Sequence, residues 1–324
     1  MSVVILTEKE LRRCVALDRA AVDAVAACFT ALADGKAENP PIMHIGIAEH
    51  VGDIDIKSAF ISGFDRVAVK IAAGFYNNHK LGLPNSPASV VLVSARTGIV
   101  EAVLLDNAYL TDLRTGAAGA VAARHLAPAK VETAGVIGAG VQARYQMEAL
   151  KLERDFKRIL VLGRSKANVD RYIAEMAERL GVAVEAAPDA ETLVRESQVV
   201  VTTTTSKAPL VMADWLHPGL LVTSVGSDLA GKQELEAACL NRADRVVCDR
   251  WAQCSKMGEL QHGDLTEEQV TEIGEITAGR AEGRTSEEQI IVCDLTGTGA
   301  QDTAIGNVAY DKALGAGMGL TIEN

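Results

Sequence analysis

The segment 134–143 contains a glycine motif of the kind that binds phosphate groups. Gly138, Gly140 and Ala143 form G-x-G-x-x-A between an apolar run and a helical pattern. In such a motif the first glycine allows a tight turn, the second lets a pyrophosphate approach the backbone, and the small third residue lets the helix pack closely on the strand. A plain strand-to-helix turn can have the same spacing. The alternating strands and helices that follow favour a dinucleotide-binding site.

The residues expected at the ribose end of that site are basic. A site that prefers NAD usually has Asp or Glu about 20 residues after the glycines, where the carboxylate accepts the 2′-hydroxyl. This chain has Arg164, Ser165 and Lys166 there. A guanidinium group beside a hydroxyl and an ammonium group suits a 2′-phosphate, so the sequence favours NADP(H), with NAD(H) as the alternative. The other interpretation is that Arg164 and Lys166 are only solvated residues of a loop and a first helical turn.

Three further stretches place polar groups where the pattern is otherwise apolar. Asp228 follows the apolar run 220–225, Lys70 lies inside the apolar run 67–71, and Arg114 lies near the start of an Ala-rich segment. In parallel sheets, ligands bind at the carboxyl ends of the strands, where Asp228 is expected. The spacing leaves open whether Lys70 faces a site or simply points outward from its strand.

The elements that position these residues predict an α/β fold with two domains. Residues 7–35 predict a helix pair that starts with a capping box of Thr7 and Glu10. Short β-branched runs between residues 40 and 105 predict an antiparallel-rich sheet. The Ala-rich pattern predicts a helix over 110–126, before Pro128.

After residue 126 strand and helix patterns alternate, which is typical of a Rossmann doubly wound parallel sheet. We expect this dinucleotide-binding domain over residues 127–299. Residues 1–126 plus 300–324, which include a final helix over 300–314, are expected to form an α+β substrate-binding and dimerisation domain. The strands predicted for the Rossmann domain are 133–137, 158–162, 182–186, 199–203, 220–225, 245–248 and 289–294.

Composition excludes several classes of function. The chain has 324 residues and a net charge of −11, so a nucleic acid would repel it. We find neither a signal-like N-terminus nor an apolar run long enough for a transmembrane helix, and expect a cytoplasmic protein with no membrane partner. The six cysteines form no C-x-x-C pair, and the spacing of Cys248, Cys254 and His262 does not suit a metal site, so no metal is expected.

Motifs along the chain resemble those of one known family. They are LRTGAA (113–118), VIGAGVQA (136–143), GSD (226–228) with GKQEL (231–235), GEL (258–260), and DLTG (294–297) with QD (301–302). With them the sequence resembles the ornithine cyclodeaminase/mu-crystallin family of NAD(P)-dependent enzymes over nearly its whole length. It looks most like the branch of ectoine utilisation and bacterial iminosuccinate reductases, through residues 63–65, 104–107, 248–250 and 258–262.

The resemblance implies a role for each polar residue. Lys70 and Arg114 would bind the carboxylate of the substrate, and Asp228 would be the acid/base beside the nicotinamide, which suits a small 2-imino acid. Many family members have Arg after the Pro-rich turn, where this chain has Met43 and His44. His44 would take the place of that arginine, or the carboxylate would depend on Lys70 and Arg114 alone. Thr296 is the fourth residue expected to bind the substrate, with Lys70, Arg114 and His44. The residues expected to bind the cofactor are Asn85, Arg114, Gly138, Gly140, Val141, Gln142, Arg164, Thr203, Thr204, Gly226, Lys232 and Leu295.

Three functions fit these residues. The first is an NAD(P)H-dependent imine reductase or amino-acid dehydrogenase. The second is a cyclodeaminase, which converts a diamino acid to a cyclic imino acid, releases ammonia and regenerates its NAD. The third is a non-catalytic NADP-linked binding protein, since the family includes lens and hormone-binding members. The presence of Asp228 together with Lys70 and Arg114 argues against the third, because binding alone needs no proton donor. The resemblance also implies a homodimer in which the two smaller sheets pack together.

Overall fold

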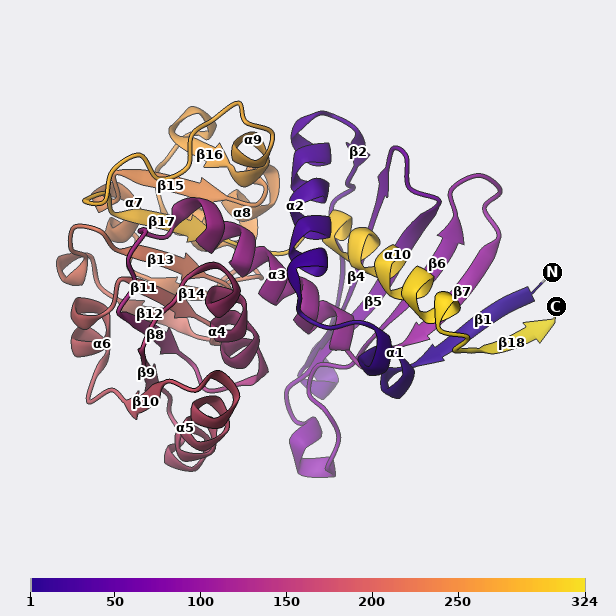
Figure 1. Ribbon diagram of the computed structural model, residues 1–324, viewed down its shortest axis with the longest axis horizontal. Coiled ribbons are helices and arrows are strands. Elements are labelled where there is room, and N and C mark those ends of the chain that lie inside the picture. The colour runs from indigo at the N-terminus through magenta and orange to yellow at the C-terminus, as the bar shows by residue number, and fades with distance from the viewer. Residues whose placement is uncertain (1, 324) are drawn as a thin grey trace. The chain divides into compact units, whose positions relative to one another are not determined.

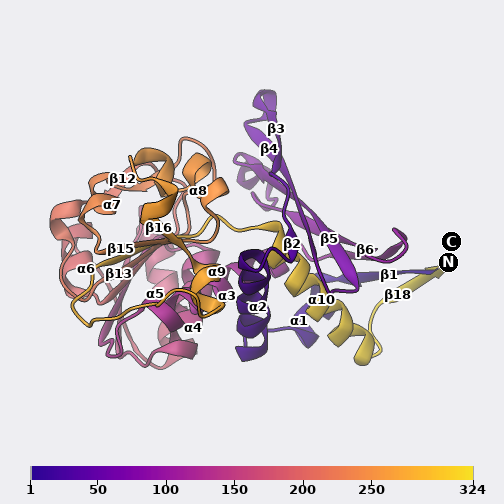
Figure 2. The same ribbon diagram turned by 90° about the horizontal axis from the view of Figure 1, so that it is seen from above.

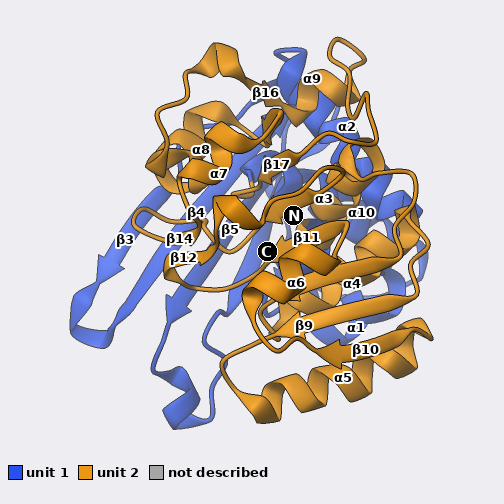
Figure 3. Ribbon diagram, turned by 90° about the vertical axis from the view of Figure 1, so that its left-hand side faces the viewer, with its two compact units in different colours: residues 1–114, 298–324 blue, residues 115–297 orange. Residues whose placement is uncertain are grey.

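The structure, a computed structural model that describes residues 2–323, divides into two compact units. Unit 1 comprises residues 1–114 and 298–324, and unit 2 comprises residues 115–297 (Figure 3). The first division falls inside helix α3 (Tyr109–Leu126), whereas the sequence pattern placed it at the end of that helix. An Ala-rich helix shows in its sequence where it stops, but not where its packing partners change.

Unit 1 is built on an eight-stranded sheet. Its strands are β1 (Ser2–Thr7), β2 (Ala37–Glu38), β3 (Met43–Ile47), β4 (Gly52–Ile61), β5 (Arg66–Phe75), β6 (Ala88–Ser94), β7 (Val100–Leu105) and β18 (Leu320–Glu323). They lie in the order β18-β1-β7-β6-β5-β4-β2, with β3 paired to β4. All pairs are antiparallel except β1 with β7, as the short β-branched runs predict. The sequence pattern does not predict β18, which lies beside β1 near the other terminus (Figure 1).

Three helices of unit 1 lie on one side of this sheet: α1 (Glu8–Cys14), α2 (Arg19–Ala33) and α10 (Gly299–Gly315) (Figure 2). The expected capping box of Thr7 and Glu10 starts α1. Helix α10 packs on β4 and β5. Alternate residues of the strands are buried beneath the helices, among them Ala68, Val90 and Leu92. Helix α10 therefore brings the end of the chain onto the strand that contains Lys70.

The opposite face of the sheet is apolar, and among the described residues α1, α2 and α10 all lie on the other side (Figure 2). Met43, Ile45, Ile71 and Leu105 are exposed on β3, β5 and β7, by 59%, 46%, 44% and 48%. Side chains of the intervening strands on this face are only half-buried. This surface, called here the outer sheet face, is a large apolar area for a monomer to leave in water.

Unit 2 contains a parallel sheet in the order β10-β9-β8-β11-β13-β17-β15-β16. Its strands are β8 (Thr133–Ile137), β9 (Arg158–Leu162), β10 (Ala183–Ala186), β11 (Val199–Thr202), β13 (Leu221–Ser224), β15 (Arg245–Cys248), β16 (Val270–Glu272) and β17 (Ile291–Asp294). The order reverses between β8 and β11, which creates the switch point at which doubly wound sheets bind ligands. The predicted Rossmann sheet is confirmed, and β16 is the strand that the pattern does not predict.

Helices cover the parallel strands. All five residues of β8 are buried, and both α4 (Val141–Glu153) and α6 (Ala190–Glu196) contact this strand. The other helices of the unit are α5 (Lys166–Leu180), α7 (Ala238–Arg242), α8 (Trp251–Met257) and α9 (Ile273–Thr277). Short 3-10 helices are η1 (Ala48–His50), η2 (Asn78–Leu81), η3 (Ala213–Trp215), η4 (Glu259–His262) and η5 (Glu267–Gln269). No helix within residues 2–323 combines the length and apolarity needed to cross a membrane.

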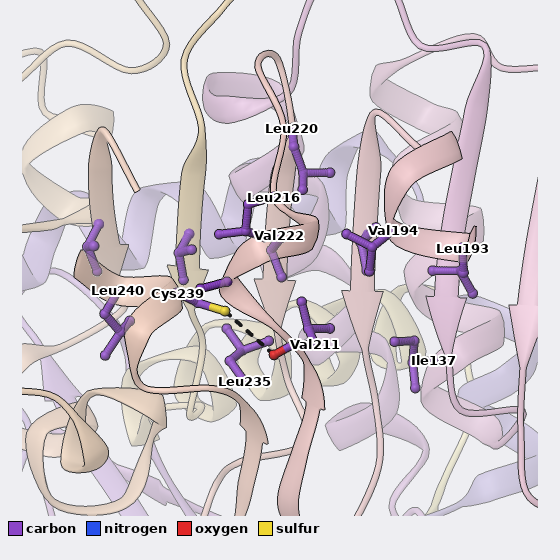
Figure 4. Close-up of a cluster of buried hydrophobic side chains, with 14 of the residues drawn as sticks. Ile137, Leu193, Val194, Val211, Leu216, Leu220, Val222, Leu235, Cys239 and Leu240 are labelled. Carbon is purple, nitrogen blue, oxygen red and sulfur yellow. Dashed lines mark hydrogen bonds between the residues drawn. The ribbon is translucent and has the colours of Figure 1, made fainter. Parts of the chain in front are cut away.

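A small second sheet of unit 2 is anchored in the hydrophobic core. Strands β12 (Lys207–Val211) and β14 (Gln233–Leu235) pair in parallel. Val211 and Leu235 point into a cluster with Leu216, Val222 and Cys239, and the Cys239 thiol donates to the Val211 carbonyl at 3.6 Å (Figure 4). The core therefore fixes the backbone of β14, and with it the residue next to Leu235, Glu234.

Candidate active site

The glycine motif forms the turn between β8 and α4, as the sequence predicts. Gly138 has a φ of +115°, and a Cβ atom there would lie 2.4 Å from the Thr203 hydroxyl oxygen. A Cβ atom on Gly140 would meet nothing within 4 Å, so the backbone borders open space at the start of the 13-residue helix α4. Ala143, the small third residue of the motif, is fully buried. An anion at Gly140 would meet free backbone N–H groups and the positive end of the helix dipole.

A cavity of about 570 Å³ opens in front of this turn, entirely within unit 2. Its lining comes from the ends of β8, β9 and β11, which is the switch point of the sheet. The cavity has the size and the donor groups that a dinucleotide requires. Polar lining residues are Arg164, Ser165, Asn168, Thr203, Thr204, Thr205 and Ser206.

The three polar residues after β9 are used differently. Arg164 and Ser165 line the cavity, and the Ser165 hydroxyl also caps α5 by accepting from the Asn168 N–H at 3.4 Å. Lys166 is 85% exposed and forms an ion pair with Asp170 at 2.7 Å. Of the residues proposed for a 2′-phosphate, Arg164 and Ser165 are therefore the ones placed at the cavity.

Asp228 lies in the loop that follows β13 and is paired with Lys232. The Lys232 ammonium group donates to the Asp228 carboxylate at 2.5 Å, while 44% of the Asp228 side chain remains exposed. The backbone carbonyl of Lys232 accepts hydrogen bonds from Ser227 and His262, at 3.0 and 2.7 Å. The loop is thus held from both sides, and it presents a carboxyl group that solvent can reach.

Unit 1 contains a buried cluster of two cations and one carboxylate. Lys70 Nζ donates to Asp302 Oδ1 at 2.9 Å and Arg114 Nε donates to the same oxygen at 3.1 Å, while Arg114 Nη1 donates to Gln301 at 3.0 Å. Lys70 is 1% exposed, so the interpretation that it points outward from its strand is wrong: the side chain faces α10.

The charges in this cluster shift the protonation of both partners. Burial lowers the pKa of Lys70 to about 7, with Arg114 acting in the same direction. Burial alone would raise the pKa of Asp302, but the charges of Lys70 and Arg114 hold it below its ordinary value. With Lys70 protonated, the three side chains carry one net positive charge, which matches one carboxylate group.

His44 lies on the β3–β4 hairpin, where its Nδ1 atom is 2.7 Å from Asp55 Oδ1. In the register, His44 is opposite Asp55, and Lys57 is opposite Lys70. Because cross-strand partners and alternate residues share a face, His44 lies on the same face of the sheet as Lys70. His44 is 49% exposed and available to a ligand on that face.

The remaining predicted residues lie in loops next to strands or in the first turn of α4. Asn85 precedes β6, and its side-chain oxygen accepts from the His79 N–H at 2.9 Å. Leu295 and Thr296 follow β17 and are buried, with the Thr296 hydroxyl within 3.0 Å of Asp249. Val141 and Gln142 form the first turn of α4, and Gly226 follows β13. The cofactor and substrate roles of all these residues remain predictions.

Two residues of the cation cluster were not among the predicted site residues. Asp302 and Gln301 lie in the first turns of α10, and both are buried. An acid and an amide inside an otherwise small and apolar helical pattern are the signal that could have identified them, because such groups are buried only with partners.

Comparisons with known proteins agree with this geometry. The model of the ornithine cyclodeaminase/mu-crystallin family matches residues 1–317. An uncharacterized cyclodeaminase of Sinorhizobium fredii is 41% identical over 99% of this chain and 98% of its own length. Among solved structures, an archaeal alanine dehydrogenase dimer with bound NAD is 34% identical with a TM-score of 0.93, covering 100% of this chain and 99% of its own.

The iminosuccinate reductase of Paracoccus denitrificans, solved in complex with NAD⁺, is 32% identical with a TM-score of 0.92 and full coverage of both chains. These likenesses extend over both units, as do the motifs that carry the family resemblance. The chain therefore belongs to the ornithine cyclodeaminase/mu-crystallin family.

Proposed function

We propose that the protein is an NAD(P)H-dependent oxidoreductase that reduces a small 2-imino acid at its C–N bond, or oxidises the matching amino acid. The observation that carries this proposal is the buried cluster of Lys70, Arg114 and Asp302, whose single net positive charge suits one carboxylate. The same chain contains a dinucleotide cavity and a solvent-accessible acid, Asp228. An imino acid reductase requires these three elements.

Each group has one task in the proposed reaction. Lys70 and Arg114 bind the substrate carboxylate, and His44 extends the polar face next to them. The cavity lined by Gly138 and Gly140 would hold the dinucleotide, which would supply the hydride for the imine carbon. Asp228 delivers the proton that the imine nitrogen gains as the C=N π bond becomes an N–H bond, and it takes that proton back in the oxidative direction. Lys232 holds the Asp228 carboxyl group in place through its hydrogen bond.

A cyclodeaminase is the second candidate, favoured by the 41% identity with a protein described as a cyclodeaminase. In that reaction the same carboxylate clamp would hold a diamino acid, and a dinucleotide in the cavity would first accept a hydride from its α-carbon while a proton leaves the α-amine. The side-chain amine would then attack the resulting imine, ammonia would leave, and the hydride would return to give the cyclic amino acid. A non-catalytic binding protein would need the cavity and the cation cluster but no proton donor.

NADP(H) is the cofactor that we propose over NAD(H). Arg164 and Ser165 line the cavity at the end of β9, where an NAD-preferring site usually places an acid. A guanidinium group forms a charge-assisted, bidentate contact with a phosphate. The solved relatives contain NAD, so we expect both dinucleotides to bind, with NADPH the tighter.

A homodimer formed through the outer sheet face is the proposed assembly. That face is apolar over several strands, and Met43, Ile45 and Ile71 are each more than two-fifths exposed on it. The archaeal alanine dehydrogenase of similar fold is a dimer. Light scattering at micromolar concentration should give twice the mass of the chain, and Ile71→Glu should reduce it to the mass of one chain.

A panel of substrates tests the reaction itself. The panel contains 2-oxo acids with ammonia or methylamine, iminosuccinate, ornithine and diaminobutyrate, and NADPH absorbance and product masses are recorded together. A reductase consumes NADPH in proportion to the amino acid formed. A cyclodeaminase releases ammonia while the absorbance returns to its starting value. Tight NADPH binding without turnover of any of these compounds would contradict both and favour a binding protein.

A further inference from the structure

Glu234 is a buried carboxylate that joins two loops of unit 2. It lies on β14, is fully buried, and accepts four hydrogen bonds. Two come from the end of β11, namely the Thr202 hydroxyl at 2.6 Å and the Thr204 N–H at 2.5 Å. The other two come from the end of β13, namely the Gly226 N–H at 2.9 Å and the Ser224 hydroxyl at 3.2 Å.

Both loops belong to the proposed site. Residues 203–206 form one wall of the dinucleotide cavity, and residues 225–228 lead to Asp228. The two loops touch at Gly226, where a Cβ atom would lie 2.1 Å from the Thr204 carbonyl oxygen. Strands β11 and β13 pair directly up to Thr202 and Ser224, and the Val225 N–H donates to the Thr202 carbonyl at 3.0 Å. Beyond this ladder, where no side chain fits between the loops, the Glu234 carboxylate links them through its hydrogen bonds to Thr204 and Gly226.

The other side of Glu234 is fixed by a second buried acid. Glu259 on η4 accepts from the backbone N–H groups of Glu234 and Leu235 at 2.8 and 3.1 Å, and the Ser224 hydroxyl lies 3.1 Å from it. Ser224 has a single hydroxyl hydrogen, yet its oxygen is within hydrogen-bond distance of both carboxyl groups. Leu235, next in the chain, is anchored in the hydrophobic core (Figure 4).

We propose that Glu234 is a positioning residue: its carboxylate sets the loop of Asp228 against the wall of the dinucleotide cavity. This rests on the proposed function of Asp228 and the cavity. Glu234 acts through these groups and is itself too deeply buried to contact a ligand. Both carboxylate oxygens must act as acceptors, because Oε1 accepts from the Thr204 N–H and Oε2 accepts from the Gly226 N–H.

The substitution Glu234→Gln tests this requirement. Whichever way the amide turns, its NH₂ group replaces one of the two acceptors, and one backbone N–H loses its partner. Glu236→Gln is the matched control, because Glu236 lies two residues further on and accepts from the Ala213 N–H at 2.8 Å, away from both loops. If circular dichroism shows that Glu234→Gln does not fold, Thr202→Val is the alternative. It removes the hydroxyl that donates to Glu234 Oε2 and keeps the side-chain volume nearly constant.

Two measurements on the whole chain read out the position of the loops without requiring turnover. We expect Glu234→Gln to accelerate amide hydrogen exchange in residues 202–206 and 224–228, and to weaken NADPH binding by roughly tenfold. Glu236→Gln should leave both unchanged. Equal exchange and equal NADPH affinity in the two variants would overturn the proposal, even if no substrate were turned over.

Kinetics then separate positioning from a general loss of structure. At saturating NADPH and substrate, Glu234→Gln should lower kcat by roughly 10- to 100-fold, since small misplacements of a reacting group cost this much. In an Asp228→Asn background the same change should have little further effect on kcat, because the group that it positions is already disabled. A full additional loss in that background would contradict the proposal. Inactivity of the unsubstituted chain would instead contradict the proposed function.

Discussion

Lys70 Nζ on β5 lies 2.9 Å from Asp302 Oδ1 on α10, although the two residues are 232 positions apart in the chain. Both side chains are 2% exposed, and Arg114 binds the same carboxylate. A buried ion pair of this kind contributes little net stability compared with an apolar core, but the loss of one partner leaves an uncompensated buried charge. The pair therefore makes the position of Lys70 depend on the last helix of the chain.

Asp302→Asn should destabilise the protein strongly. The change leaves two buried cations without a carboxylate, and breaking a buried pair costs about 3 to 5 kcal/mol. Asp311→Asn is the control, because Asp311 lies on the same helix and pairs with Arg66 while 63% exposed. It should cost less than about 1 kcal/mol. Urea denaturation gives the free energies of unfolding of both variants. Equal losses of stability in the two variants would contradict a special role for the buried Asp302 carboxylate.

Substrate binding should weaken as the pH rises through about 7. Burial lowers the pKa of Lys70 to about 7, so its ammonium form, which binds a carboxylate, is present below that pH and is lost above it. We expect kcat/KM for the imino acid to fall up to tenfold per pH unit above 7. Lys70→Arg, which keeps its charge, should flatten this limb. A profile that is flat from pH 6 to 9 in the unsubstituted chain would contradict a binding role for the Lys70 ammonium group.

Stability should depend on pH through Glu259. Burial raises its pKa from the ordinary 4.5 to about 7, so the folded state favours the protonated acid. This contribution is fully present below pH 4.5 and is lost as the pH rises to about 7, and a shift of this size corresponds to about 3 kcal/mol. Glu259→Gln should reduce the slope in this interval, to which Asp106, with its pKa raised to about 6 by burial, also contributes. Free energies of unfolding measured between pH 4.5 and 8 test this prediction. An unchanged slope in Glu259→Gln would contradict it.

Local patterns in the sequence predict most of the fold correctly. Strands β8, β9 and β15 have the predicted bounds, because the interior of a strand buried on both faces is an apolar run. The capping box of Thr7 and Glu10 is equally local. Strand β18 is not predicted, because four exposed residues have no burial pattern and their pairing with β1 is a long-range event.

The site is only partly predictable, for the same reason. The glycine turn can be read from Gly138, Gly140 and Ala143, since its geometry depends on neighbouring residues. The direction in which the Lys70 side chain points cannot be read from the sequence, because its burial depends on Asp302. Glu234 belongs to the GKQEL motif (231–235), but the motif does not reveal its partners, because its four donors come from the ends of two separate strands.

Removal of Arg164 should abolish a preference for NADPH. A charge-assisted contact with the 2′-phosphate contributes about 1.5 to 3 kcal/mol, which is tenfold or more in affinity. Arg164→Ala should therefore bind NADPH and NADH about equally. Lys166→Ala is the control, because Lys166 is 85% exposed and paired with Asp170, and it should keep the preference. Fluorescence titration measures the affinities of the unsubstituted chain and both variants for NADPH and NADH, and equal affinities in the unsubstituted chain would refute the assignment.

Asp228→Asn should separate catalysis from binding. Asparagine keeps the size of the side chain and accepts the Lys232 hydrogen bond, but it has no transferable proton. If Asp228 moves the proton at the substrate nitrogen, kcat should fall by roughly 10² to 10⁴ while the affinity for NADPH hardly changes. Arg114→Met should instead raise KM, because it removes a cation that binds the carboxylate. Unimpaired turnover in Asp228→Asn, measured with the imino acid that gives the highest rate, would remove Asp228 from the mechanism of either a reductase or a cyclodeaminase.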